Sequence, residues 1–475
     1  MNKIDDRTVR PNAEAAADRR QPTAVLFCYH YDPSSAVASR RVRAMAHVLA
    51  SMGLAVEVVS AFGGAPVEYG ENLGPGIFAH PVFEPSSLLL SKLVWIKRLL
   101  TRGTAMPIGE PAVAPAAEEP GVDVSPRGIV QRIRDAYFAL LYIIDTQKKW
   151  AIRAASSALR STRNRDVRVV VTSGPPFSGV VAAWFVARRL RAPLITDFRD
   201  PFLTASDGVI NIPRPARVML RSIEREVVAY SAAVTAAAPG MTLALQQRYP
   251  SRASLIHLMM NGYDEGPSTE IAFTGYRLCV LFAGILYPNR DPFPFLRAVE
   301  TLLAKPNVDH SRIAIKFVGE CDQYCGVSLA AWLRGKRAAH VVELLPKRTR
   351  KELQPLIDKA TVMLTLAQGQ RPLIPAMAFE HLASGREVLA ICEPDSDTGR
   401  LLATVRGVTQ VAPDHQTAIE SALESLYQRH AIDGTLTLPA REDVRRFSRQ
   451  NSNDIFKRIL GAVMRRQDQR PGETT

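Results

Sequence analysis

The chain has 475 residues, 47% of them hydrophobic, so it can bury a large core, but it exceeds the roughly 250 to 300 residues at which one core stops growing. Its 60 basic and 46 acidic residues give a net charge of +14, which suits nucleic acid, anionic lipid or phosphorylated ligands, although solvated arginine-rich helices would also produce it. Five scattered cysteines exclude a disulfide framework, and the close pair Cys321 and Cys325 lacks a second pair of metal ligands. We therefore expect two domains with free thiols.

Both ends of the chain are expected to be disordered tails, at residues 1–22 and 467–475. The first tail is polar and charged and has no apolar region of the kind found in a signal peptide. No stretch of the sequence approaches the roughly 20 apolar residues of a membrane-spanning helix. These features predict a protein that stays on the cytoplasmic side of the membrane.

Residues 23–262 alternate between short β-type runs and longer helical segments, which predicts a parallel sheet wrapped by helices. The first unit is a buried strand at 24–29, a helix with apolar residues at helical spacing, and a second strand at 55–60. Further strands are expected at 167–172, 194–197 and 233–235, and helices at 150–160, before Leu190, at 217–230 and from about Gly240.

Residues 63–127 interrupt this rhythm and are interpreted as a partly disordered insertion in the first domain. Within it, residues 86–102 combine a continuous apolar run with four basic residues. This segment could lie on an anionic bilayer, where each basic residue contributes about 1 kcal/mol. Alternatively, it packs on the first domain as a helix whose basic side chains extend to solvent.

A second domain of the same type is predicted at residues 276–440. Its strands are expected at 277–283, 313–318, 341–345, 362–366 and 387–392, with a helix at 294–303 and others between the strands. Residues 441–466 contain a final helix, at 447–465, with apolar side chains along one face.

The turn after the first strand lacks the glycines of a dinucleotide-binding loop. It contains small residues instead, and Arg40 and Arg41 follow at a helix start, where backbone N–H groups favour anions. As a phosphate-binding loop this is a weak signal.

Polar motifs follow three predicted strands of the first domain, at 172–177, 197–201 and 261–264. Ligands of open α/β sheets bind beyond the carboxyl ends of the strands, so these motifs predict one cleft. Each could instead be an ordinary turn, with Arg199 paired to a neighbouring aspartate.

In the second domain, residues 284–291 follow one strand, and residues 374–382 follow another and start a helix. Glu380 lies one turn inside that helix. A carboxylate there can accept both hydroxyls of a ribose, or it can simply complement the positive end of the helix.

Taken in order, these motifs resemble the GT-B glycosyltransferases, specifically the glycosyltransferase family 4-like group, over nearly the whole chain outside the tails and residues 63–127. The matches are Ser-Arg-Arg-Val-Arg at 39–43, Ser-Gly-Pro-Pro at 173–176, Asp-Phe-Arg-Asp-Pro at 197–201 and Asn-Gly-Tyr-Asp at 261–264. The resemblance implies an α/β fold of two Rossmann-like domains that face each other across a cleft, with the C-terminal helix crossing back to the first domain.

In such enzymes the second domain binds a nucleotide-sugar and the first presents the acceptor. Transfer is expected to retain the anomeric configuration and to need neither a metal nor a cofactor, because basic residues and helix ends neutralise the departing diphosphate. The resemblance places at the reaction centre Asp197, Arg199, Asp200 and Arg290. It places at the donor Gly284, Arg290, Lys347, Pro375, Met377, Phe379 and Glu380, and on the acceptor side Ser39, Arg40, Arg41, Ser173 and Gly174.

Four residues depart from the family pattern. Ile285 stands where an arginine is usual, Ala376 and Met377 replace Gly-Lys, and Pro372 replaces a sugar-contacting glutamate. Each departure removes a charge or a donor from the place where negative charge develops, and one such group is typically worth about 2.7 to 4 kcal/mol.

The leading hypothesis is a glycosyltransferase of surface or exopolysaccharide biosynthesis that acts on a glycan or lipid-linked acceptor, at the inner face of the plasma membrane if residues 86–102 bind lipid. The alternative from a different class is an inactive GT-B scaffold in a polysaccharide-assembly complex. A nucleic-acid binder is disfavoured because the chain lacks a recognisable reading module, and the match at 197–201 argues against a sugar-nucleotide epimerase.

Overall fold

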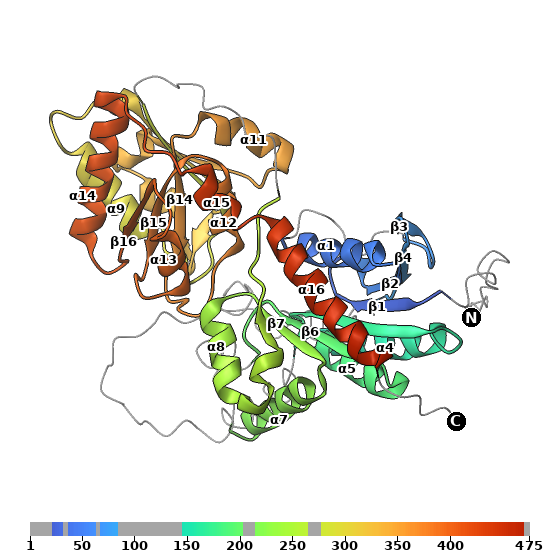
Figure 1. Cartoon of the computed structure of the whole chain (residues 1–475). Coiled ribbons are helices and arrows are strands. Elements are labelled where there is room, and N and C mark those ends of the chain that lie inside the picture. The colour runs from blue at the N-terminus through green and yellow to red at the C-terminus, as the bar shows by residue number, and fades with distance from the viewer. Residues whose placement is uncertain are drawn as a thin grey trace, which may run out of the picture.

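The computed structural model describes residues 21–31, 37–62, 67–83, 145–202, 214–264 and 277–469. They form two α/β lobes, each built around its own sheet, and the last helix of the chain returns from the second lobe to the first (Figure 1). Residues 86–102, the proposed bilayer-binding segment, lie outside the described residues, as do most of both tails.

The first lobe is built on an eight-stranded sheet. Its strands are β1 (Thr23–Phe27), β2 (Ala55–Ser60), β3 (Asn72–Gly74), β4 (Ile77–Pro81), β5 (Val167–Gly174), β6 (Leu194–Phe198), β7 (Ala233–Ala236) and β8 (Ile256–Leu258). They are ordered β3-β4-β2-β1-β5-β6-β7-β8, and only β3 and β4 are antiparallel neighbours. Strands β1, β2, β6 and β7 are buried along their whole length, as expected for a parallel sheet that is covered on both faces.

Helices cover both faces of this sheet. They are α1 (Val37–Ser51), α4 (Lys148–Ser161), α5 (Phe177–Leu190), α7 (Arg214–Tyr230) and α8 (Pro239–Arg248), followed by a 3₁₀ turn at Pro250–Leu255. Because side chains alternate along a strand, Leu26 of β1 packs in the same cluster as α1, whereas Phe27 packs with α4 and α5. The strands and helices expected from the sequence in this lobe are present.

The expected insertion at 63–127 needs correction for its first part. Strand β4 extends the sheet beside β2, with which it is parallel, and β3 adds a short antiparallel edge. The burial of Ile77 and Ala79 shows that this segment belongs to the core of the first lobe. Its strands were missed because they are short and lie between glycines, without the long apolar runs of the central strands.

The second lobe contains a fully parallel six-stranded sheet and a small antiparallel hairpin. The sheet strands are β9 (Leu278–Ile285), β10 (Ile313–Glu320), β13 (Val342–Leu345), β14 (Val362–Ala367), β15 (Glu387–Cys392) and β16 (Val408–Val411), and the hairpin strands are β11 (Gln323–Tyr324) and β12 (Val327–Ser328). The sheet order is β13-β10-β9-β14-β15-β16. The strands expected from the sequence in this lobe are confirmed. The sequence did not predict β16, a half-buried strand at the edge of the sheet.

Helices again flank the second sheet. They are α9 (Phe293–Leu303), α10 (Leu329–Leu333), α11 (Arg350–Lys359), α12 (Ala376–Ala383), α13 (Asp397–Leu402) and α14 (Gln416–Tyr427), with 3₁₀ turns at His310–Arg312 and Arg337–His340 and a π-helical turn at Gln428–Asp433. The capping box of Thr349 and Glu352 fixes the start of α11.

The two lobes share one apolar core. A single cluster of buried residues includes Phe198 and Met241 from the first lobe and Phe379 and Leu402 from the second. The backbone N–H of Gly240, at the start of α8, also donates to Asp397 of α13 at 2.6 Å. The lobes are therefore held together by packing as well as by the chain connections.

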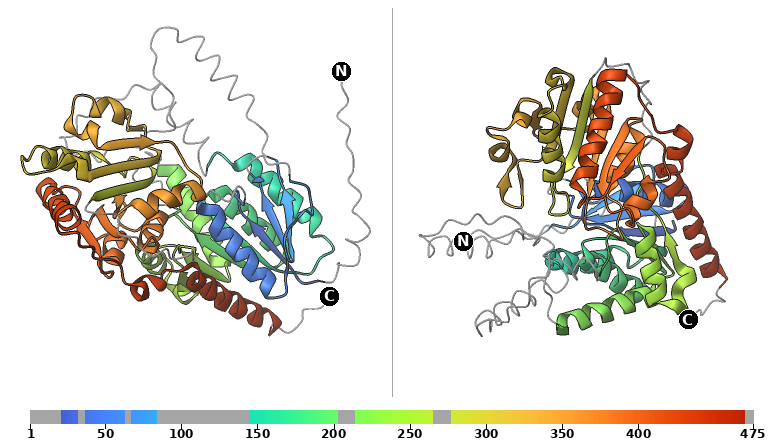
Figure 2. Two further views of the ribbon diagram at one scale, coloured as in Figure 1. Left: turned by 90° about the horizontal axis from the view of Figure 1, so that it is seen from above. Right: turned by 90° about the vertical axis from the view of Figure 1, so that its left-hand side faces the viewer.

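After α15 (Arg441–Arg445), the last helix α16 (Arg449–Asp468) lies beside α1 on the first lobe, as both views in Figure 2 agree. Its Phe456, Ile459, Leu460 and Val463 are buried in the same cluster as α1 and β1. The crossing-back helix predicted at 447–465 is present. No helix within the described ranges combines the length and apolar character needed to span a bilayer.

Replacing Phe456 by alanine is expected to reduce the free energy of unfolding of the first lobe by about 3 to 5 kcal/mol, because the ring is 1% exposed and a cavity would remain. Urea denaturation followed by tryptophan fluorescence measures this loss. Lys457→Ala, at the adjacent exposed position, should change stability by less than about 0.5 kcal/mol. Equal losses in the two variants would contradict the packing of α16 on α1.

Candidate active site

Asp197, the last residue but one of β6, is the centre of a buried network. Arg41 of α1 binds it with two hydrogen bonds, Nε to Oδ2 at 2.9 Å and Nη2 to Oδ1 at 2.6 Å. Ser173 of β5 and Thr235 of β7 donate to the same carboxylate at 2.7 and 2.6 Å. Asp197 is 0% exposed and Arg41 4%. The carboxylate therefore has four donors and no access to solvent in this conformation.

Arg41 also ties the end of the first lobe to this network. Its Nη2 donates to the carbonyl of Met259 at 2.7 Å, and its Nη1 donates to that of Met260 at 3.0 Å. Burial raises the pKa of Asp197, but the charge and hydrogen bonds of Arg41 outweigh this, and the pKa lies below its ordinary value. The predicted site residues Asp197, Arg41 and Ser173 thus lie together in a buried arrangement that positions the strand ends.

Arg199 and Asp200 lie just beyond this network. Arg199 Nη2 donates to the carbonyl of Pro175, and its backbone N–H donates to the carbonyl of Gly174 at 2.9 Å. Burial lowers the pKa of Arg199 and raises that of Asp200, which faces the charge of Arg199. At Gly174, a Cβ would come within 2.7 Å of Val180, so only glycine fits this turn.

Arg40 reaches across to the second lobe. Its Nη1 lies 2.5 Å from Oε1 of Glu380, on α12, and 3.2 Å from Oδ2 of Asp264, in the segment that joins the lobes. The three side chains are between 21% and 33% exposed. The preceding residue, Ser39, is fully buried, and its hydroxyl has no hydrogen-bond partner among the described residues. The two predicted ligand contacts Arg40 and Glu380 are therefore bound to each other here.

Asp264 also interacts with two further arginines. Arg449, at the start of α16, donates to its Oδ1, and Arg350, at the start of α11, lies 3.5 Å from its Oδ2. Burial raises the pKa of Asp264, but the hydrogen bonds and charges of Arg449 and Arg40 lower it by more than burial raises it. The pKa of Asp264 therefore lies below its ordinary value. The carboxylate thus links helices of both lobes to the segment between them.

Two glycines allow a close approach of backbones at the ends of β9 and β10. Gly319 has a φ of +130°, and a Cβ there would lie 1.9 Å from the carbonyl oxygen of Gly284. The methyl group of Met377, on α12, would lie 3.4 Å from a Cβ at Gly284. The predicted donor residues Gly284 and Met377 are therefore neighbours.

Arg290 is a half-buried cation in the second lobe. Its Nη1 donates to the carbonyl of Ile285 at 3.0 Å, and its guanidinium lies 5.0 Å from the ring centre of Tyr287. Burial lowers its pKa, but a guanidinium keeps its proton in proteins. Within the described ranges Nε has no hydrogen-bond partner and no carboxylate forms an ion pair with the group. The charge of Arg290 is therefore available to an anion.

His381 was not singled out from the sequence, although it follows Glu380 directly. Its Nδ1 lies 2.7 Å from the Thr365 hydroxyl on β14, and its Nε2 has no partner among the described residues. Burial and the nearby charge of Arg290 lower its pKa to about 3, so the imidazole is neutral at pH 7.

The start of α12 completes this part of the second lobe. Pro375 is its N-cap, and the first N–H groups of a helix have no partner within it. Phe379 is fully buried, with its ring 6.0 Å from that of Phe447, so it supports the core. Lys347 is exposed, with its Nζ 3.6 Å from Oε1 of Glu320 at the end of β10. Across the described parts of the chain, no group of three or more His, Cys, Asp or Glu side chains could hold a metal ion.

Asp197→Asn is expected to cost about 3 to 5 kcal/mol of stability at pH 7, because Arg41 would be left buried without its partner. The native pKa is below the unfolded value of about 3.9, so the carboxylate's contribution is complete above that pH and lost as pH falls through the native pKa. The difference in free energy of unfolding between wild type and variant should therefore shrink below about pH 4.

Urea denaturation at pH 7 and at pH 3 to 5 measures this difference. Asp166→Asn is the matched control, because Asp166 is 55% exposed and forms only a loose pair with Arg168. A loss at Asp197 no larger than at Asp166 would contradict the structural role of the network.

No protein-family model and no curated protein sequence matches the chain. Solved structures match over nearly the whole length. A sucrose-phosphate synthase from Thermosynechococcus elongatus aligns with a TM-score of 0.57 and 12% identity over 94% of this chain and 99% of the other. Anabaena HepE in complex with UDP-glucose aligns with a TM-score of 0.54 and 12% identity over 93% of this chain and 99% of the other.

A trehalose 6-phosphate synthase from Burkholderia multivorans aligns with a TM-score of 0.54 and 11% identity over 94% of this chain and 99% of the other. These neighbours are GT-B glycosyltransferases, and at such low identity the likeness concerns the fold. The chain has the GT-B fold, with two parallel-sheet domains, as the sequence predicted.

Proposed function

We propose that the protein is a glycosyltransferase that takes a sugar from a nucleotide-sugar donor bound at the second lobe. The observation that carries this proposal is Arg290, a half-buried cation whose Nε is unpaired and which has no carboxylate partner among the described residues. A fixed, partly desolvated positive charge is what a diphosphate leaving group requires. Among the structural neighbours, Anabaena HepE was solved with UDP and with UDP-glucose.

In the proposed reaction Arg290 and the N–H groups at the start of α12 stabilise the charge that develops on the departing diphosphate. This assigns neutralisation to the protein instead of to a metal ion. Glu380 accepts the ribose hydroxyls, and the backbone at 345–347 meets the base. We infer a retaining transfer to a glycan or lipid-linked acceptor in polysaccharide assembly, on the cytoplasmic side of the membrane, with the first lobe presenting the acceptor.

Arg40 adds a condition to this proposal. We infer that a bound ribose draws the Glu380 carboxylate, whose Oε1 lies 2.5 Å from Arg40 Nη1, away from this ion pair. Donor binding therefore exchanges an interdomain ion pair for contacts with the nucleotide.

A second candidate function is an inactive GT-B scaffold. It is favoured by Ile285, Pro372 and Met377, which supply no charge at three positions of the expected donor site, and by the closed ion pair of Arg40 and Glu380. Transfer or hydrolysis of any nucleotide-sugar by the purified protein would exclude it.

The donor site is tested by thermal shift with UDP, GDP and ADP. A nucleotide present at 100 times its Kd should stabilise the protein by about 2.7 kcal/mol, and Arg290→Ala should remove most of the shift. Arg297→Ala on α9 is the matched control, because this arginine is exposed and bonds only to Gln416 among the described residues. If none of the three nucleotides raises the melting temperature, the proposal is wrong.

Arg40→Ala is expected to tighten nucleotide binding, because Glu380 would be free. A partly exposed ion pair is worth about 0.2 to 1 kcal/mol, so Kd should fall by up to about fivefold in calorimetry. Arg350→Ala is the matched control, since Arg350 contacts Asp264 but not Glu380. Weaker binding by the Arg40 variant would instead mean that Arg40 itself contacts the nucleotide.

A further inference from the structure

Helices α4, α5 and α7 form one layer on the sheet of the first lobe. Strand β6 shows this, because Leu194 and Phe198 lie on the same face of the strand, and they pack in the clusters that contain α4 and α5 and that contain α7. Ile195, on the other face, packs in the cluster of α1 and α16. The Tyr230 hydroxyl of α7 also donates to the carbonyl of Ala187 on α5 at 3.0 Å. The outer sides of the three helices therefore belong to one surface of the lobe.

Each helix of this layer exposes a large apolar side chain. Ile152 of α4 is 69% exposed, Phe185 of α5 51% and Val218 of α7 66%. By contrast, the described residues of α1 and α16, on the opposite face of the same sheet, expose no large apolar side chain. A single exposed apolar residue is common on a protein surface, but three on adjacent helices of one layer indicate contact with an apolar partner.

Exposed basic residues accompany these apolar side chains. In the described part of the three helices they are Lys149, Arg153, Arg160, Arg188, Arg189, Arg221 and Arg225. All but Arg153 lie three, four, seven or eight positions from the exposed apolar residue of their own helix, a spacing that places them on the same side. Helices α4 and α5 contain no acidic residue, and the exposed carboxylate on α7 is Glu226, 3.8 Å from Arg225.

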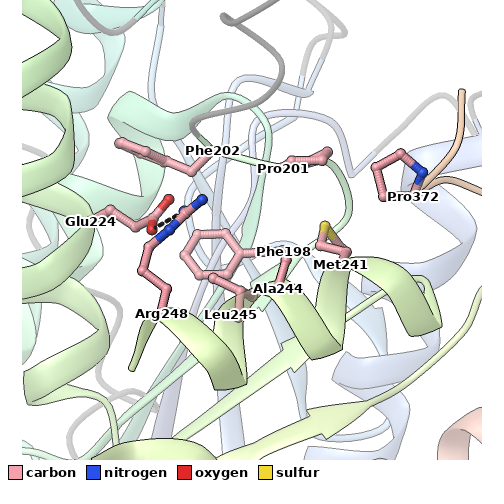
Figure 3. Close-up of a pocket in the computed structure, with 9 residues that line it drawn as sticks. All are labelled: Phe198, Pro201, Phe202, Glu224, Met241, Ala244, Leu245, Arg248 and Pro372. Carbon is pink, nitrogen blue, oxygen red and sulfur yellow. Dashed lines mark hydrogen bonds and ion pairs between the residues drawn. The ribbon is translucent and has the colours of Figure 1, made fainter. Parts of the chain in front are cut away.

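The other carboxylate of α7 points inward. Glu224 is 1% exposed and is paired with Arg248 of α8 at 2.7 Å, beside Phe198 and Leu245 (Figure 3). The inner side of α7 is thus fixed by α8 and β6. Because this carboxylate is turned away from solvent, the outer surface of the layer keeps its positive charge.

Among partners that carry negative charge, an anionic bilayer also offers an apolar phase. Basic side chains bind lipid phosphates at headgroup level, while apolar side chains beside them enter the acyl boundary. Nucleic acid attracts the same cations through its phosphates, but it gives aliphatic side chains such as Ile152 and Val218 no apolar phase to enter. The core of a protein interface is depleted in charged residues, whereas here basic and apolar side chains are interspersed.

We propose that the outer side of α4, α5 and α7 docks the protein on an anionic bilayer, with Ile152, Phe185 and Val218 entering the boundary between headgroups and acyl chains. This surface is distinct from residues 86–102, the segment considered from the sequence alone. The docking does not depend on the proposed glycosyl transfer, because it requires no nucleotide.

The test is flotation of the full chain with two kinds of vesicle, phosphatidylcholine alone and phosphatidylcholine with about 30% phosphatidylglycerol. At about 0.1 M salt the protein should float with the anionic vesicles and not with the neutral ones, and about 0.5 M salt should weaken binding because it screens the charges. Equal binding to both kinds of vesicle, or binding to neither, would overturn the proposal.

Two double variants at exposed positions locate the contact. Arg189→Gln with Arg221→Gln should weaken binding about 25-fold, because each basic residue at an anionic surface contributes about fivefold in affinity. Phe185→Ser with Val218→Ser should weaken it at least about tenfold, because less apolar surface is inserted. A loss in the arginine pair alone would indicate a purely electrostatic surface, as for nucleic acid, and would overturn the proposal.

Matched controls carry the same changes at exposed positions of the second lobe. They are Arg297→Gln with Arg334→Gln, and Val327→Ser with Ile432→Ser. Both controls should bind the anionic vesicles as the wild type does. If the first-lobe variants bind as tightly as these controls, the membrane contact lies elsewhere in the chain and the assigned surface is wrong.

Thermal shift with UDP, GDP and ADP on the same proteins separates this proposal from the proposed function. The double variants should keep the melting temperature of the wild type, which shows that lost vesicle binding is not unfolding, and should keep its nucleotide shift. Vesicle binding by the wild type without any nucleotide shift would overturn the proposed function alone. A nucleotide shift without vesicle binding would overturn the docking surface alone.

Discussion

The buried pair of Arg41 and Asp197 holds the functional edge of the first lobe together. One carboxylate, in β6, accepts from β5, β7 and α1, and the arginine continues to the carbonyls that follow β8. The backbone links these strand ends, as the N–H of Arg199 does by donating to the carbonyl of Gly174, and the shared carboxylate adds side-chain hydrogen bonds that fix the loops. Such a pair is stable only if its remaining hydrogen-bonding positions are satisfied, and here they are.

This pair also determines where Arg40 points. Successive residues of a helix are rotated by about 100° about its axis. Because Arg41 is held by Asp197 at the end of β6, the preceding residue Arg40 points toward the second lobe. There it meets Glu380 and Asp264. Asp264 in turn binds Arg449 at the start of α16, which packs on α1. The ion pairs that Arg40 forms between the lobes therefore follow from the packing of α1 in the first lobe.

Much of the fold could be predicted from the sequence because the central strands are continuous apolar runs and their helices carry one apolar face. Short edge strands such as β4 and β16 lack that signal and were missed. The motif at 197–201 correctly indicated the sheet edge, but nothing in the sequence shows that Asp197 has all its oxygens occupied. The contact of Arg40 with Glu380 joins residues 340 positions apart, and only the folded arrangement of the two lobes creates it. The function of these residues stays a prediction.

The arginines described above differ between the two lobes in how their charge is balanced, and this difference argues for the location of an anion. In the first lobe Arg40 and Arg41 are paired with carboxylates, and Arg199 is bonded to carbonyls and faces Asp200. In the second lobe Arg290 has a carbonyl and an aromatic ring beside it, but no carboxylate among the described residues. Burying a cation without a counter-charge is costly unless a ligand supplies one. His381 sharpens the contrast, because its low pKa keeps it neutral and prevents a second positive charge from forming beside Arg290. Among these described arginines, Arg290 thus has a positive charge without a counter-charge, whereas Arg40 and Arg41 are each paired with a carboxylate.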